Sequence, residues 1–134
     1  MKIALLLFVS MIIASCASKP KVSDAQMRDY KLWYQAVKLR AAPAWSQLFH
    51  AKKATIHDLL IQSKKEGPFK TKVHVIVATD GTVRDVQFVD KTDIEALDIV
   101  AQDTFMKIDP LPRPPASLVK DGVASLWWDF VVEK

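Results

Sequence analysis

The sequence predicts an α+β fold, in which N-terminal helices precede a small antiparallel sheet of three strands packed by one further helix. Three observations predict it. Apolar residues recur at helical spacing between residues 24 and 66, and then alternate with polar residues on both sides of Asp80-Gly81. Helical spacing returns after Thr92, and a last alternating run, Val123 to Val132, supplies the third strand.

The first half of the chain is expected to be helical from residue 24 to about residue 66. Asp24 is a suitable N-cap residue, and an amphipathic stripe follows it. Pro43 is expected to end or restart this helix. A second helical segment begins near Thr55, and Gly67-Pro68 marks its end. The stripe consists of Met27, Tyr30, Tyr34, Val37 and Ala41.

The middle of the chain predicts a β-hairpin. The valines at 73, 75 and 77 alternate with Lys72, His74 and Ile76, which is typical of a strand. Residues 79–82 form the turn, since Asp-Gly readily adopts positive φ. The step from Val83 to Val86 breaks the alternation of the return strand and predicts a bulge there.

The last helix is the clearest in the chain. Thr92 with Glu95 predicts a capping box, and Pro110 ends the helix. The Pro-rich run 111–115 is either a stiff connection to the last strand or a docking segment for a partner. Asp121-Gly122 predicts a second turn. The buried stripe of the helix is Leu97, Val100, Ala101, Thr104, Phe105 and Ile108.

In the last strand, the two neighbouring tryptophans point to opposite faces. Trp128 is expected in the core, because it shares its parity with Leu126 and Phe130. Trp127 is either exposed on the other face or covered by the N-terminal helix together with Trp33 and Trp45. An exposed aromatic side chain would favour a binding surface.

No residue pattern points to catalysis. His50 and His57 are about 10 Å apart along a helix, too far to share a metal ion. His74 is expected to be exposed on the outer face of its strand, Asp98 to be solvated, and Ser125 to lack a catalytic partner. We therefore expect no metal site, no cofactor and no enzymatic activity. A net charge of +4 without a dense basic block does not indicate nucleic-acid binding.

The N-terminus resembles a bacterial lipoprotein signal. Lys2 precedes an apolar run from Ile3 to Ala14, and Cys16, the chain's one cysteine, follows Ser15. The run is too short to span a membrane, and an ordinary secretory signal would leave Cys16 as an unpaired thiol. The resemblance implies a signal peptide at 1–15, a lipidated Cys16 and a tether through residue 23. Ala17 after the cysteine implies the outer membrane, with the protein facing the periplasm.

The second half of the chain resembles the C-terminal domain of the TonB and TolA periplasmic proteins. Asp80-Gly81-Thr82-Val83 is similar to the TonB strand and turn pattern, while Trp128-Asp129-Phe130 is slightly closer to TolA. The resemblance covers residues 55–132. It divides the mature chain into a helical segment, 24–54, and a TonB/TolA-like domain, 55–134. A long Pro-rich arm and a membrane helix that could couple to a motor are not found.

From this resemblance we expect a non-catalytic protein-binding module of the cell envelope. The last strand is the expected exposed edge, where a partner could add a strand. Its partner-binding residues are predicted to be Ser125, Trp127, Asp129 and Val131. Two alternatives stay open: an accessory of TonB-type transport across the outer membrane, and a structural subunit of a secretion or pilus assembly.

Overall fold

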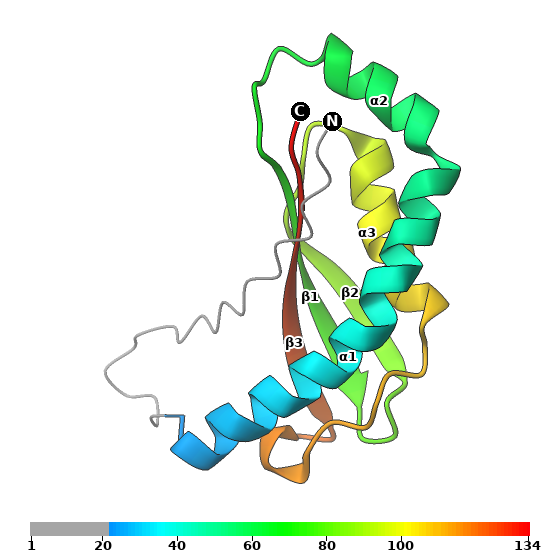
Figure 1. Ribbon diagram of the computed structural model, residues 1–134. Helices are drawn as coiled ribbons and strands as arrows, with labels where there is room; N and C mark the ends of the chain where they lie inside the picture. The colour runs from blue at the N-terminus through cyan, green and yellow to red at the C-terminus, as the bar shows by residue number, and fades with distance from the viewer. Residues whose placement is uncertain (1–21) are drawn as a thin grey trace.

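The computed structural model describes residues 22–134, so the predicted signal peptide, the lipid attachment at Cys16 and most of the tether lie outside the described residues. Its helices and strands follow the predicted order and confirm an α+β fold (Figure 1). The elements are α1 (Asp24–Ala51), α2 (Lys53–Gln62), β1 (Phe69–Ala78), β2 (Val83–Asp90), α3 (Glu95–Lys107), the 3₁₀ turn η1 (Ala116–Leu118) and β3 (Val123–Val132).

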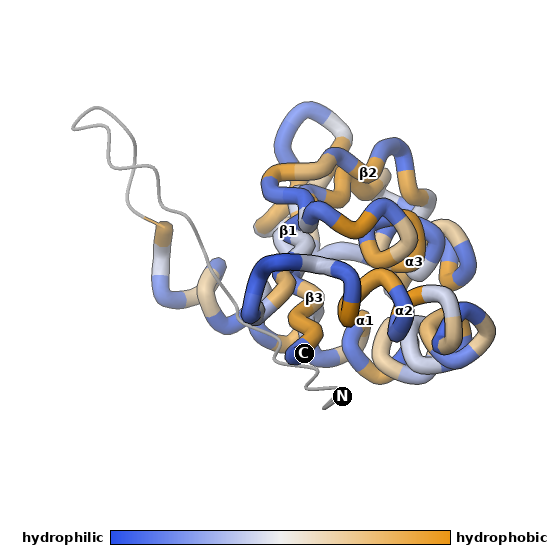
Figure 2. The backbone as a smooth tube through the Cα atoms, turned by 90° about the horizontal axis from the view of Figure 1, so that it is seen from above, coloured by the Kyte–Doolittle hydropathy of each residue, from blue (hydrophilic) through white to orange (hydrophobic). Residues whose placement is uncertain are grey.

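The three strands form one antiparallel sheet in the order β2-β1-β3. All three helices lie on the same side of these strands, as the views in Figures 1 and 2 show. β1 is therefore the central strand, and β3, the last in the chain, is an outer strand as predicted.

The hairpin between β1 and β2 has the predicted turn and the predicted bulge. The amide of Ala78 donates to the Thr82 carbonyl, and Gly81 has φ +94°. Val77 pairs with Val83, but Ile76 pairs with Asp85, so Arg84 is the extra residue of the bulge.

The prediction that Pro43 ends or restarts the first helix is wrong, because α1 continues through it to Ala51. Proline removes one helical hydrogen bond and disfavours the turn before it, at a cost of about 3 kcal/mol. Pro43 itself is exposed, whereas Ala41, Ala44 and Trp45 beside it are buried in the core. Packing of these neighbours stabilises the helix on both sides of the proline.

Two predicted helix caps are also corrected. Ser23, not Asp24, caps α1, because its hydroxyl accepts from the Gln26 amide while the Gln26 side chain accepts from the Ser23 amide. No Thr92–Glu95 box forms at α3. Instead Asp98, 6% exposed and not solvated as expected, accepts from the Thr92 amide at 2.9 Å. A carboxylate in the first turn also faces the positive end of the helix dipole.

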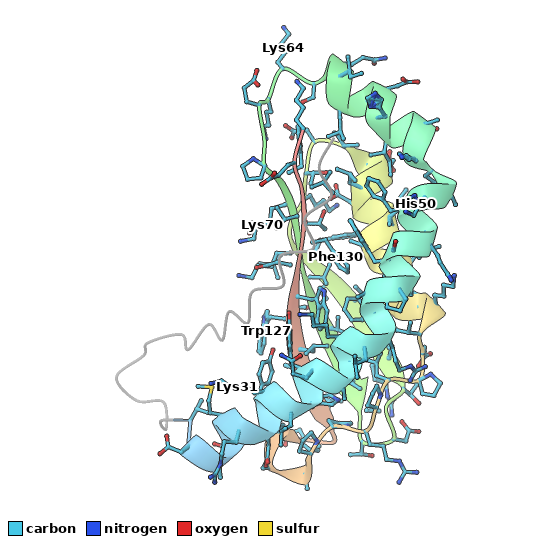
Figure 3. All side chains as sticks on the ribbon, viewed as in Figure 1. Lys31, His50, Lys64, Lys70, Trp127 and Phe130 are labelled. Atoms are coloured by element: carbon cyan, nitrogen blue, oxygen red, sulfur yellow. The ribbon has the colours of Figure 1, made fainter. Side chains whose placement is uncertain are left out.

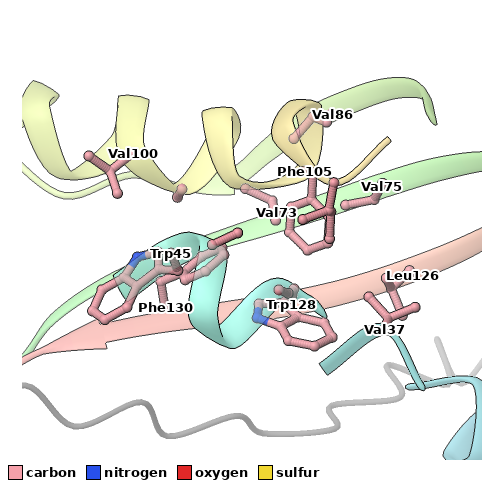
Figure 4. Close-up of a cluster of buried hydrophobic side chains, with 14 of the residues drawn as sticks. Val37, Trp45, Val73, Val75, Val86, Val100, Phe105, Leu126, Trp128 and Phe130 are labelled. Carbon is pink, nitrogen blue, oxygen red and sulfur yellow. The ribbon is translucent and has the colours of Figure 1, made fainter. Parts of the chain in front are cut away.

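One hydrophobic core lies between the sheet and the helices (Figure 4). Trp128 is 1% exposed, which confirms its predicted place, and it stacks on Tyr34 of α1 with ring centroids 4.4 Å apart. Phe105 of α3 meets Trp128 edge-on. α1 and the sheet thus share one core, and the expected division after residue 54 falls within α2.

Candidate functional site

The sheet has two outer strands, β2 and β3, and the predicted binding edge is the outer side of β3. Within residues 22–134, no strand pairs with β3 on the side away from β1. The Trp127 amide donates to the Tyr30 hydroxyl of α1 at 3.3 Å, outside the ladder with β1. Because backbone groups of an antiparallel strand point to alternate sides, the amides and carbonyls of Ser125, Asp129 and Val131 also face this edge. These are the four residues predicted to bind a partner.

The side chains of Ser125 and Trp127 form a cluster with His74 on the outer face of the sheet. His74 and Trp127 are paired across β1 and β3, and their rings stack with centroids 4.6 Å apart and planes within 2°. The Ser125 hydroxyl is 2.8 Å from Nε2 of His74. Residue pairs that do not exchange ladder hydrogen bonds bring their side chains closest, which explains this stack.

This cluster corrects two expectations and settles a third. His74 is half-buried rather than exposed, and Ser125 does have a partner, His74. Trp127 is half-buried on the outer face, while Trp33 bonds the Pro112 carbonyl and Trp45 stacks near Phe130. Trp127 is therefore not grouped with the other tryptophans. Figure 3 shows Trp127 and Lys70 projecting from the sheet on the side away from α3.

The side chains of the other two predicted residues are buried. Asp129 is 1% and Val131 5% exposed. Nζ of Lys70 lies 3.5 Å from the Asp129 carboxylate, and Lys72 is paired directly across from it. Long lysine stems cover neighbouring groups while their charged ends stay near water. Because these exposures include the main chain, Asp129 and Val131 offer a partner almost no accessible surface, whereas Ser125 and Trp127 are partly exposed.

A groove of about 600 Å³ runs beside the first half of β3; we call it the edge groove. One wall comes from the start of α1, and the other from η1 and the turn that follows it. The predicted Asp121-Gly122 turn is present, with φ of +54° and +81°. The amides of Lys120 and Val123 donate to each other's carbonyls across it. The lining residues are Val22, Gln26, Tyr30, Ser117, Leu118, Val119, Lys120, Asp121, Val123, Ser125 and Trp127.

The Pro-rich segment positions the second wall of the edge groove. The Leu111 amide donates to the Gly81 carbonyl at 2.8 Å, and Nε1 of Trp33 donates to the Pro112 carbonyl at 2.8 Å. The Arg40 guanidinium donates to the carbonyls of Ile108 and Pro110. These bonds hold the segment to the hairpin and to α1. They favour the interpretation as a stiff connection over that as a docking segment.

Two buried tyrosines of α1 lie along the same edge. Burial raises the pKa of Tyr30, and the hydrogen bond from the Trp127 amide opposes this in part. Burial also raises the pKa of Tyr34, with smaller contributions from Tyr30 and from the charge of Asp129. Both hydroxyls therefore stay neutral at physiological pH. The neutral Tyr30 hydroxyl accepts the hydrogen bond of the Trp127 amide and thereby divides the free edge of β3 into two parts.

The edge carries one pair of side chains with chemically reactive groups, Ser125 and His74. Ser125 and His74 have the hydrogen bond of a nucleophile and base, but no carboxylate among the described residues orients the imidazole. In residues 22–134, no three His, Cys, Asp or Glu side chains gather as metal ligands would. None of the helices in that range is long and apolar enough to cross a membrane.

Sequence reasoning missed Tyr30 and the wall formed by residues 117–121 as parts of the site. Tyr30 belongs to the apolar stripe of its helix, so spacing alone places it in the core. Residues 117–121 carry no distinctive motif beyond the Asp121-Gly122 turn. Comparisons of the chain with protein-family models, with curated proteins and with solved structures find no match.

Proposed function

We propose that this protein is a non-catalytic lipoprotein that binds an envelope protein through the free edge of β3. Its anchor would be a lipidated Cys16 in the outer membrane, with the folded part facing the periplasm. The observation that carries the binding proposal is the edge groove beside main-chain groups of β3. A hairpin, a helix and a final strand also occur in the order that the resemblance to TonB and TolA implies.

The edge suits an extended segment that adds to β3 over a short length. The amide and carbonyl of Ser125 face the groove, and the groove walls offer apolar contacts from Val119, Leu118 and Trp127. Main-chain hydrogen bonds supply affinity in strand addition, and side-chain pockets supply specificity. On this edge, Val123 is already bonded to Lys120, and the Trp127 amide to Tyr30. We therefore place the main contact at Ser125 and in the groove.

Site-specific photo-crosslinking tests the binding surface. A photoreactive residue at Lys120, in the groove, should give a discrete protein adduct in intact cells. Ser125→Pro should remove that adduct, since proline lacks the donor at the edge and leaves the ladder with β1 intact. The matched control is Val89 of β2, an exposed residue on the opposite outer strand. Equal adducts from both positions, or adducts unaffected by Ser125→Pro, would contradict the proposal.

The anchor is tested separately. The purified wild-type protein should carry acyl chains on an N-terminal Cys16, as mass spectrometry would show. Cys16→Ser should leave an unprocessed precursor or release the protein from the membrane fraction. Unchanged processing and fractionation of this variant would refute the lipoprotein assignment while leaving the edge site open.

A further inference from the structure

The outward face of α1 carries the two most exposed large apolar side chains of the described chain. Leu32 is 71% and Leu39 79% exposed. They are seven residues apart, and so lie almost on one line along the helix. Ala36 falls between them and Pro43 follows one turn later, so no charged side chain interrupts this line. We call Leu32, Ala36, Leu39 and Pro43 the outer stripe.

The neighbouring polar side chains of α1 are engaged with the rest of the molecule on one flank. The Ser117 hydroxyl donates to Asp29, and the Lys107 ammonium donates to Gln47 at 2.8 Å. Arg40 bonds two carbonyls that follow α3. The outer stripe has no such contact among the described residues, and the sheet packs against the opposite side of the helix. It is therefore an unpartnered face in the structure.

The other flank of the outer stripe is basic. Lys31 and Lys38 lie about two turns apart on that flank, and Arg28 lies within the stripe's N-terminal continuation. The acidic residues of α1 are Asp24 in the first turn and Asp29, which is bonded to Ser117. A helix face with leucines and flanking lysines fits the headgroup region of an anionic bilayer.

The chain that precedes α1 places this face close to a membrane, if Cys16 is lipidated as proposed above. Residues 17–23 separate Cys16 from α1, and they span at most about 25 Å when fully extended. α1 has 28 residues and is about 42 Å long, so the tether is shorter than the helix. The first folded element that the bilayer meets is therefore α1.

We propose that the outer stripe of α1 rests on the lipid headgroups, with Leu32 and Leu39 inserted and Lys31 and Lys38 on anionic phosphates. The lining residues Gln26 and Tyr30 of the edge groove lie on the other side of the helix. Docking by the stripe thus turns the groove away from the bilayer. The anchor supplies attachment, and the stripe supplies a fixed orientation in which the groove is open to the periplasm.

The test uses full-length protein purified from membranes and reconstituted in vesicles of phosphatidylethanolamine and phosphatidylglycerol. Leu39→Cys is labelled with nitrobenzoxadiazole, and Val89→Cys of β2 is the matched control, since Val89 is also an exposed apolar residue. We expect blue-shifted emission at position 39 that doxyl-labelled lipids quench, and water-like emission at position 89. Adding Lys31→Glu and Lys38→Glu should reduce the shift and the quenching.

The results distinguish contact of the outer stripe with lipid from contact with protein, and test lipidation separately. Water-like emission at position 39 overturns the proposal, and so does a blue shift without quenching by lipid, which would indicate contact with a second protein copy. Labelling of the parent protein, whose one cysteine is Cys16, would show a free thiol and refute lipidation itself. A blocked Cys16 with water-like emission at 39 refutes only the orientation on the bilayer.

Discussion

Replacing Gly81 by alanine tests whether the hairpin tip holds the Pro-rich segment in place. A Cβ at Gly81 would lie 2.1 Å from the Leu111 carbonyl oxygen, and the φ of Gly81 is +94°. The left-handed conformation costs an alanine about 1–2 kcal/mol. Displacing Leu111 also breaks the hydrogen bond from its backbone amide to the Gly81 carbonyl, which contributes about 0.5–1.5 kcal/mol. With the clash, we expect Gly81→Ala to lower the free energy of unfolding by about 2–4 kcal/mol.

Gly122→Ala is the matched control, because Gly122 also has positive φ, +81°, but no atom within 4 Å of an added Cβ. It should cost only the conformational part, about 1–2 kcal/mol. Urea unfolding followed by tryptophan fluorescence measures both variants. In Gly81→Ala, hydrogen exchange should also speed up at the Leu111 amide. Equal losses of stability in the two variants would refute the close approach between the hairpin and this segment.

Three further predictions follow from buried or hydrogen-bonded groups. Burial raises the pKa of Tyr30 and Tyr34, the chain's two tyrosines, above 10.0, so ultraviolet titration of the native protein should show no tyrosinate near pH 10. The contribution of the two neutral tyrosines to stability is complete below pH 10 and is lost as the pH rises further. Titration of both tyrosines near pH 10 in the native protein would contradict this prediction. Asp98→Ala should lower the free energy of unfolding by about 2–4 kcal/mol and Asp98→Asn by less, as measured in urea, because Oδ1 accepts hydrogen bonds from two threonines. The hydrogen bond from the Thr82 amide lowers the pKa of Asp80 below 3.8, so an NMR titration of the Asp80 carboxyl should have its midpoint below pH 3.8. The stabilisation by the ionised carboxylate should be lost as the pH falls through that midpoint, and a midpoint at or above 3.8 would disprove this prediction.

Local sequence was enough to predict the strands and the last helix. The last strand was expected at Val123–Val132, and β3 has those bounds, since strict alternation specifies a strand with one buried face. The Asp80-Gly81 turn and the bulge after Val83 follow equally from backbone chemistry and from a break in the alternation. The stripe from Leu97 to Ile108 is buried throughout.

Features that depend on distant contacts were not predictable from local sequence. Pro43 is tolerated because residues on both sides of it pack into a core shared with β3. Asp98 is buried because Thr71, which lies 27 residues earlier, brings a hydroxyl to it at 2.8 Å. The contact between Tyr30 and Trp127 joins residues 97 positions apart. Spacing identified the strand that forms the edge, but not the tyrosine that divides it.

The bond from the Trp127 amide to Tyr30 also has a consequence for self-assembly. β3 is long and largely apolar, and an open strand of this kind can template fibrils through stacked segments of about six residues. Here Tyr30 interrupts the row of main-chain groups, leaving Ser125 on one side and Asp129 and Val131 on the other. Neither part is long enough to propagate a cross-β stack. If the protein is anchored in a membrane as proposed, neighbouring molecules could keep this strand open without polymerising with one another.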